Sequence, residues 1–281
     1  MKNYKIRLRY IKHQQYIYRK VLKSRQRNKK TTIVHRNIVK KPYSSNVLKN
    51  LKEKGFALSS YDVQSYVCLE VPGQFCISNN PNESLYFLRK MYTALTDLRV
   101  KELHFSHLNC KYIGACASTI MDIIVLECMK WRKSINSPIN ISGDLVDNRV
   151  SLNQEVDALV KKSGLLRHLQ IHKSPVPNTE TLELINNGNS SEVTEKSIDY
   201  INKSLRRHGV ALTREGVNHF GKFFGEIIDN CKEHGGPNVE WFTLGHYSYD
   251  KESGLGKCKL CIVDFGDTIY ESLKYNSSTS P

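Results

Sequence analysis

The chain has 281 residues, of which 40% are hydrophobic and 25% are charged, and its formal net charge is +15. This length accommodates two domains, and the composition is that of a soluble protein. No run approaches the ~18 apolar residues that cross a bilayer, and the basic N-terminus lacks the apolar core of a signal peptide, so we expect a cytoplasmic protein without a transmembrane segment.

The positive charge is concentrated in an N-terminal arm, residues 1–44. Seventeen of the 42 Lys and Arg residues precede Glu53, the first acidic residue, whereas the rest of the chain has 25 basic and 27 acidic residues. Four tyrosines, at positions 4, 10, 16 and 18, alternate with the basic residues. Two interpretations carry equal weight: residues 1–41 are a solvated flexible tail, or they bind nucleic acid or an acidic membrane surface.

Residues 45–172 alternate between helical and extended patterns. Apolar residues recur there at helical spacing or in short runs bounded by Gly and Pro. The predicted elements are a helix at 47–53, a strand at 66–71, a helix at 83–98, a strand at 100–105, a buried helix at 113–131, a strand at 139–145, a helix that begins with the capping box at Ser151, and a strand at 168–172. This alternation predicts a small mixed or parallel sheet covered by helices.

In element order, and in the turn before Ile113, residues 66–172 resemble a STAS domain, the fold of anti-anti-sigma factors. The resemblance implies that a STAS-like domain at 45–172 binds a protein partner. Members of that family carry a phosphorylatable serine at the head of the helix that follows the second strand. Here that position reads Gly114-Ala115-Cys116-Ala117, so we expect this domain to signal by contact and not by being phosphorylated.

A linker is predicted at residues 173–194. Pro175 and Pro177 begin it, and the small polar residues of 186–191 follow. Such a composition favours a segment without a core of its own. A helix at 197–207 is predicted to come next, ended by Gly209.

The eight cysteines lie mostly in apolar surroundings, in a chain too long to need disulfide bonds for stability. We therefore predict reduced thiols packed in cores. Cys258 and Cys261 have the spacing of a zinc-binding pair, but the chain offers no second pair, and two residues three apart on a strand face opposite sides. A zinc site is thus the less favoured interpretation.

A long helix capped by Thr213 carries the residues that point most directly to chemistry. Phe220, Phe224, Ile227 and Cys231 recur at helical spacing and predict one apolar stripe. On its flank lie Glu226, Asn230 and His234, each four residues apart. A carboxylate and an amide oxygen in such a row can hold a hydrated divalent cation and activate a hydroxyl group. The alternative is an ordinary solvated helix flank.

After the helix, the pattern predicts a β-hairpin with strands at 239–248 and 257–263, which leads into Asp264-Phe265-Gly266. A carboxylate that ends a strand can accept a hydrogen bond from a ligand, and a glycine two residues later allows the ligand to approach the backbone closely.

The pattern Glu226-x-x-x-Asn230-x-x-x-His234, followed by Asp264-x-Gly266, resembles the first two nucleotide-binding motifs of the ATP-binding domain shared by histidine kinases and gyrase, the GHKL or Bergerat fold. The spacing is most similar to that of the anti-sigma-factor serine kinases. The resemblance implies that Asn230 binds Mg²⁺ at the phosphates of ATP, that Glu226 is a general base and that Asp264 binds the adenine amino group. His234 would either hold the start of a lid or cap the end of the helix.

Two features depart from the family pattern. The second glycine of its Asp-x-Gly-x-Gly motif is replaced here by Thr268, which would have to serve in its place. Only fifteen residues follow Gly266, without a second glycine-rich phosphate loop or a lid. We therefore expect an incomplete ATP-binding domain at 195–281.

Together these patterns predict the α/β and α+β classes: a small STAS-like sheet-and-helix domain followed by a C-terminally incomplete Bergerat-type α/β sandwich. The expected function is that of an ATP-binding regulatory or signalling protein, and whether it turns over ATP stays open. The alternatives are a non-enzymatic switch that senses nucleotide or binds a partner, and a nucleic-acid-binding protein that acts through residues 1–41.

Overall fold

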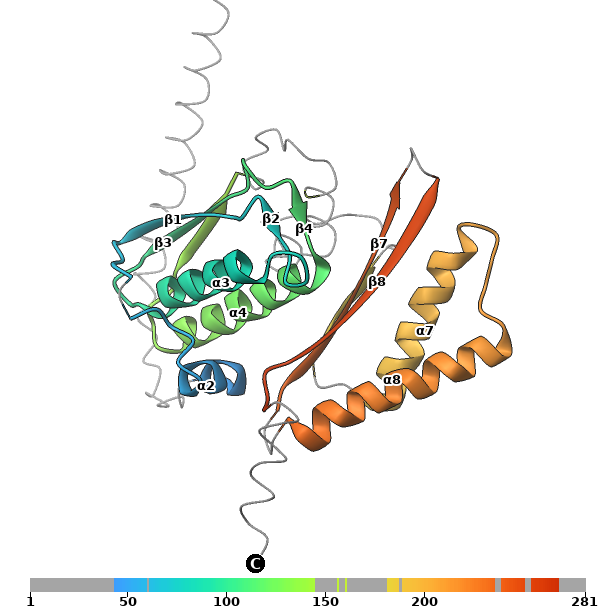
Figure 1. Cartoon of the computed structure of the whole chain (residues 1–281). Helices are drawn as coiled ribbons and strands as arrows, with labels where there is room; N and C mark the ends of the chain where they lie inside the picture. Colours follow the sequence, from blue (N-terminus) through green and yellow to red (C-terminus); the bar gives the residue numbers. More distant parts are fainter. Residues whose placement is uncertain are drawn as a thin grey trace, which may run out of the picture. The chain divides into compact units, whose positions relative to one another are not determined.

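The computed structural model describes residues 43–59, 61–144, 156, 160, 181–186, 189–235, 239–250 and 254–267. The chain divides into two units, Met1–Lys41 and Pro42–Pro281, and every described residue belongs to the second. These residues form a mixed α/β structure of five helices and three sheets (Figure 1), in agreement at this coarse level with the expected fold class. None of the helices described is both long enough and apolar enough to cross a membrane.

The first sheet is parallel, with the strand order β1-β3-β5. Its strands are β1 (Tyr66–Glu70), β3 (Glu102–Ser106) and β5 (Asn140–Gly143). Successive strands are connected through α3 (Pro81–Thr96) and α4 (Ala115–Ser134), which lie on the same face of the sheet (Figure 1). Of the two predicted alternatives, a mixed or a parallel sheet, the parallel one is confirmed over these residues, together with the predicted order of strands and helices.

The two faces of this sheet differ because both crossovers run in the same direction across it. Right-handed connections then place both helices on one face. On that face the side chains of Leu69 and Phe105 are 2% exposed. On the other face Cys68, His104 and Ser142 stand opposite one another on neighbouring strands. Within the described part of the chain, the face opposite the helices thus carries a row of polar side chains that crosses the three strands.

Two shorter elements complete this part of the molecule. Helix α2 (Asn46–Glu53) begins at Ser45, whose side chain accepts a hydrogen bond from the Leu48 N–H at 3.3 Å, and its position agrees with the prediction. Strands β2 (Gln74–Phe75) and β4 (Tyr112–Ile113) pair in parallel. At two residues each, these strands are too short to produce a periodic pattern, which is why the sequence analysis missed them.

The second three-stranded sheet is antiparallel, with the order β6-β7-β8. Strands β7 (Trp241–Asp250) and β8 (Leu255–Asp264) form the predicted hairpin. Strand β6 (Thr181–Asn186) pairs with β7, although it lies in the range predicted as a linker. Helices α7 (Ser190–Arg206) and α8 (Arg214–His234) cover one face of this sheet.

Helix α4 is buried on most sides, as predicted, because it contacts both sheets. Ile124 and Cys128 are fully buried in the core beneath β1 and β3, and the same core includes Phe242 of β7. The two sheets therefore share one core within a single compact unit. Of the helix predicted from Ser151, only Val156 and Val160 are described, and both are buried in this core. The predicted strand at 168–172 lies outside the described residues.

A polar cluster at the carboxyl end of β3 and β5 encloses a buried histidine. Asp144 accepts hydrogen bonds from Ser106 Oγ at 2.7 Å, from His104 Nε2 at 3.2 Å and from the His107 N–H at 3.1 Å. The His107 side chain is 8% exposed, and neither ring nitrogen has a hydrogen-bond partner among the described residues. Burial lowers the pKa of His107 to about 4, although Asp144 acts in the opposite direction.

We expect His107 to make stability depend on pH. Its folded-state pKa of about 4 lies below the unfolded value of 6.5, so the unfolded state binds the proton first, and stability is lost progressively as the pH falls from 6.5 to 4. Between pH 7 and pH 5 the free energy of unfolding should fall by about 2 kcal/mol through this group. Urea unfolding at both pH values measures the change, and His107→Leu should remove that part of it. An equal change in His107→Leu would contradict the assignment.

Candidate functional site

Helix α8 forms where the sequence places signals at both ends. The Thr213 side chain accepts a hydrogen bond from the Gly216 N–H at 3.0 Å, and Glu215 lies in the first turn, where negative charge is favourable. At the other end the Gly235 N–H donates to the Cys231 carbonyl at 3.1 Å. The predicted N-cap is confirmed, and the helix ends beside the loop that follows β8.

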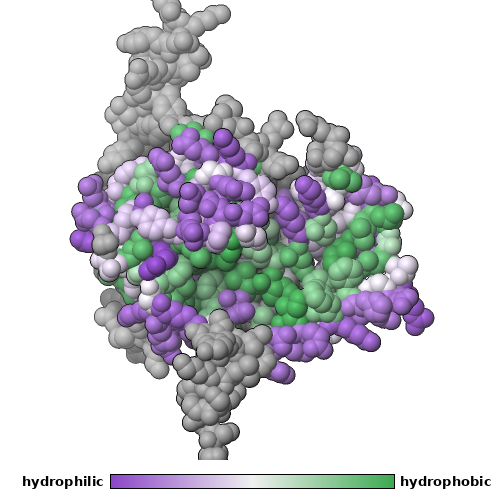
Figure 2. Space-filling model, in the orientation of Figure 1, coloured by the Kyte–Doolittle hydropathy of each residue, from purple (hydrophilic) through white to green (hydrophobic). Residues whose placement is uncertain are grey.

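The buried face of α8 differs from the predicted stripe. Phe224 is 6% exposed and Ile228 is 1% exposed, and Cys231 packs partly against the same core as Ile228. Phe220, by contrast, is 37% exposed, and Ile227 is only half-buried. The predicted apolar stripe of Phe220, Phe224, Ile227 and Cys231 is therefore buried only in part, because periodicity does not determine which residues of a stripe the sheet covers. Apolar surface is visible in the region of α7, whereas the outer edge along α8 is largely hydrophilic (Figure 2).

Glu226 and Asn230 are both exposed on α8, one helical turn apart. A separation of four residues corresponds to about 6 Å along the helix axis, so both side chains lie on one flank, as predicted. His234 is the last residue of the helix, and its side chain lies outside the description. The Glu226 carboxylate and the Asn230 amide are therefore accessible to a ligand. Both roles considered for His234 stay predictions.

The structure brings the Asp264 loop against the end of α8. The Cys231 thiol donates a hydrogen bond to Asp264 Oδ2 at 3.6 Å. Burial, with the nearby Asp264 carboxylate, raises the pKa of Cys231 to about 11. The Asp267 N–H donates to the Gly235 carbonyl at 3.2 Å. Asn230 precedes Cys231 directly, so the two predicted motifs meet at this end of the helix.

Gly266 is required at its position by close packing. A Cβ atom there would lie 2.2 Å from the Gly235 carbonyl oxygen and 2.5 Å from the Gly235 Cα atom. The Gly266 N–H also donates to Asp264 Oδ1 at 3.0 Å, which holds the carboxylate in the turn. The glycine thus serves the contact between loop and helix, whereas the sequence analysis assigned it to a close approach by ligand. Thr268 lies outside the described residues.

Two residues of α2, which the sequence analysis did not single out, hold this loop from another side. Asn50 Nδ2 donates to the Phe265 carbonyl at 2.8 Å. Lys54 Nζ lies 3.0 Å from the Gly266 carbonyl and 3.3 Å from Asp267 Oδ1. Their spacing of four residues is common on helix surfaces, so the sequence contained no specific signal for them. The loop is thereby linked to the first half of the compact unit.

The side chains at this site are suited to bind a polar ligand. Asp264 is exposed and keeps acceptor capacity beyond its two hydrogen bonds, and Glu226 and Asn230 add a carboxylate and an amide oxygen. Within the described residues no three His, Cys, Asp or Glu side chains are grouped so that they could hold a metal ion. A magnesium ion at Asn230 would therefore take most of its ligands from phosphate and water, as this ion commonly does.

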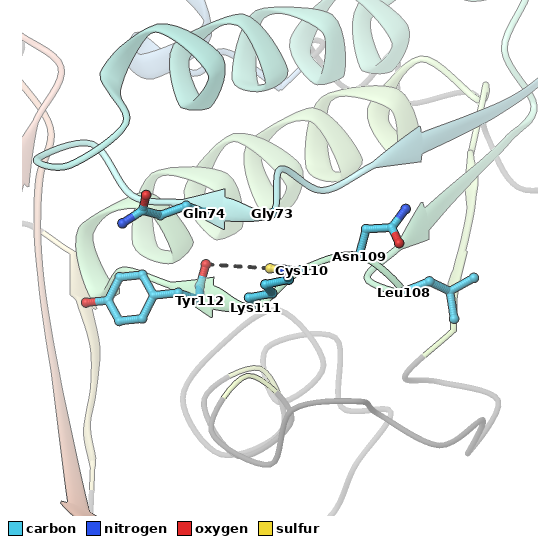
Figure 3. A pocket seen from close by; sticks show the side chains of 7 residues that line it. All are labelled: Gly73, Gln74, Leu108, Asn109, Cys110, Lys111 and Tyr112. Atoms are coloured by element: carbon cyan, nitrogen blue, oxygen red, sulfur yellow. Dashed lines mark hydrogen bonds between the residues drawn. The ribbon is translucent and has the colours of Figure 1, made fainter.

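A separate pocket of about 900 Å³ lies beside β2 and β4 (Figure 3). Its lining includes Gln74, Leu108, Lys111 and Tyr112. Among the lining residues, the Cys110 thiol donates to the Tyr112 carbonyl at 3.6 Å. None of the predicted site residues that the structure describes lines this pocket, so it is distinct from the site at the end of α8.

Comparisons of the chain with models of protein families, with curated proteins and with solved structures give no significant match.

Proposed function

We propose that this chain is a regulatory protein that binds ATP with magnesium at the end of α8. The observation that carries the proposal is the contact between the two motifs. Asp264 lies 33 residues after Cys231 in the chain and accepts a hydrogen bond from the Cys231 thiol. The backbones of Gly235 and Gly266 are also in contact. The roles proposed for Asn230 and Asp264 in one nucleotide site require the helix and the Asp-x-Gly loop to lie next to each other.

The proposal assigns one role to each residue. Asp264 accepts a hydrogen bond from the adenine amino group, and Asn230 is a ligand of Mg²⁺ at the phosphates. Glu226, exposed on the same flank, is the general base for a water or serine hydroxyl if the phosphoryl group is transferred. His234 and Thr268 complete the nucleotide contacts, and a protein partner binds the STAS-like half.

The contact of α2 with the Asp264 loop favours a second candidate, a switch without turnover. Asn50 and Lys54 bind the loop through its carbonyl groups and Asp267. A nucleotide that ordered this loop would bias the position of α2 and alter the surface presented to a partner. Turnover separates the two candidates: an enzyme loses its ATPase or kinase rate in Glu226→Gln, whereas a switch has no such rate in the unaltered chain.

Calorimetric titration of ATP into the full chain with Mg²⁺ tests the proposal. We expect saturable binding, and we expect Asp264→Asn to raise the Kd by about 10- to 100-fold, as for a lost hydrogen bond to a charged group. Asp199→Asn is the control: Asp199 lies on α7, 57% of its side chain is exposed, it has no role in the proposed site, and the Kd of this variant should stay close to that of the unaltered chain.

A second pair of variants tests the metal. Asn230→Ala should weaken binding in the presence of Mg²⁺ and leave binding in EDTA nearly unchanged, whereas Glu215→Gln, an exposed residue in the first turn at the opposite end of α8, should change neither. Absence of ATP binding in the full chain would refute the nucleotide proposal. Salt-sensitive binding of RNA or DNA would then favour the function assigned to residues 1–41.

A further inference from the structure

Cys116 of α4 and Cys261 of β8 meet although 145 residues separate them in the chain. The Cys261 thiol donates to Cys116 Sγ, and the two sulfur atoms lie 2.8 Å apart. Both residues are free thiols. A disulfide bond joins sulfur atoms at about 2.05 Å, so a side-chain movement of less than about 1 Å would bring them to bonding distance.

The two thiols have different environments. Cys116 is exposed and is the second residue of α4, where the backbone N–H groups of the first turn favour a thiolate. Cys261 is 2% exposed. Dissolved reactants can therefore reach Cys116, whereas Cys261 is accessible chiefly through its neighbour.

The surroundings also favour ionisation of Cys116. The hydrogen bond from Cys261, with a smaller contribution from Lys259, lowers the pKa of Cys116 to about 7, and the same hydrogen bond raises the pKa of Cys261. Lys259 is held nearby by Tyr112, whose hydroxyl lies 3.4 Å from Lys259 Nζ and whose ring lies beneath the ammonium group. A thiol with an ordinary pKa is only a few per cent thiolate at neutral pH.

Core packing explains other cysteines but not Cys116. Cys76, Cys110 and Cys128 are buried, as the sequence analysis predicted for most of the eight. Cys68, Cys116 and Cys258 are exposed, so the prediction of packed thiols was wrong for these three. Of the exposed cysteines that the structure describes, Cys116 is the one with a second thiol at 2.8 Å.

We propose that Cys116 and Cys261 form a hydroperoxide-reactive dithiol site, in which Cys116 is the nucleophile and Cys261 the resolving thiol. The Cys116 thiolate attacks one peroxide oxygen, the O–O bond breaks, and Cys116 becomes a sulfenic acid while hydroxide leaves. Cys261 then loses its proton and attacks the Cys116 sulfur. The S–O bond breaks, the leaving hydroxide takes up a proton, and a disulfide and water result.

The disulfide would join two parts of the fold that now only pack together. Cys116 lies at the start of α4, and Cys261 lies three residues before Asp264 on β8. A covalent bond at this point would hold β8 against α4 and close a long loop of the chain, which disfavours the unfolded state. A dithiol reductant would reverse the change by thiol–disulfide exchange.

The test treats the reduced full chain with one equivalent of hydrogen peroxide at pH 7. We expect the loss of two thiols per molecule, a mass lower by two hydrogen atoms, a peptide pair that links Cys116 to Cys261, and a higher urea midpoint that dithiothreitol reverses. In Cys261→Ser, Cys116 should stop at the sulfenic acid and be trapped by dimedone. In Cys116→Ser, peroxide consumption should slow by about tenfold or more.

Cys258→Ser is the matched control, because Cys258 is an exposed thiol on the same strand. It should react like the unaltered chain. The proposal is overturned if Cys116→Ser consumes peroxide at an unchanged rate. It is also overturned if peroxide treatment of the unaltered chain gives no peptide that links Cys116 to Cys261. Peptide mapping of the unaltered chain decides this even if a variant does not fold.

Discussion

Replacing Arg132 with Met should lower the free energy of unfolding by at least about 3 kcal/mol, since several buried carbonyl groups would lose their donor. Arg132 is completely buried at the end of α4. Its guanidinium donates to the carbonyls of Val100 at 2.6 Å, Ser137 at 2.8 Å, and Leu95 and Asp97 at 3.1 Å. One side chain thus holds together the end of α3, the approach to β3 and the turn after α4.

Arg99→Met provides the matched control for Arg132→Met. Arg99 lies near the same turn and pairs with Asp97 at 2.7 Å, but its side chain is 67% exposed. An exposed pair of this kind contributes at most about 1 kcal/mol. Urea unfolding followed by tryptophan fluorescence measures both variants, and similar losses in the two would refute the role of Arg132.

Gly266→Ala should cost about 2–3 kcal/mol of stability and, if the proposed site is correct, also abolish the binding of ATP. The new Cβ atom would lie 2.2 Å from the Gly235 carbonyl oxygen. Both partners are backbone, so the loop must move away from α8. That movement breaks the hydrogen bond from the Asp267 N–H to Gly235 and displaces Asp264.

Trp241 provides a local probe for this variant. It stands opposite Asp264 in the β7–β8 pairing, and Trp131 is the other tryptophan of the chain. In a Trp131→Phe background, the emission of Trp241 should change in Gly266→Ala. It should not change in Gly73→Ala, where a Cβ atom would meet its nearest neighbour at an ordinary 3.4 Å. An unchanged spectrum and midpoint in Gly266→Ala would contradict the packing.

The local elements of this protein could be predicted because their signals lie within a few residues. Thr213 marks the start of α8, and alternation over 239–263 marks the hairpin. The spacing of Glu226 and Asn230 places them on one flank in any helix. The assignment of ATP to these residues comes from their resemblance to a family, and it stays a proposal.

Contacts between distant segments were decided by the tertiary structure alone. The position of the second sheet determines that Phe224 and Ile228 of α8 are buried while Phe220 is exposed. Strand β6 forms in the predicted linker because the edge of β7 offers hydrogen-bond partners to a chain without a strong pattern. Asn50 reaches the Asp264 loop, and Cys116 meets Cys261, only because α2 and α4 pack near β8. Periodicity determines which residues share a face, but the energy of burial determines which face is covered, and that depends on the whole chain.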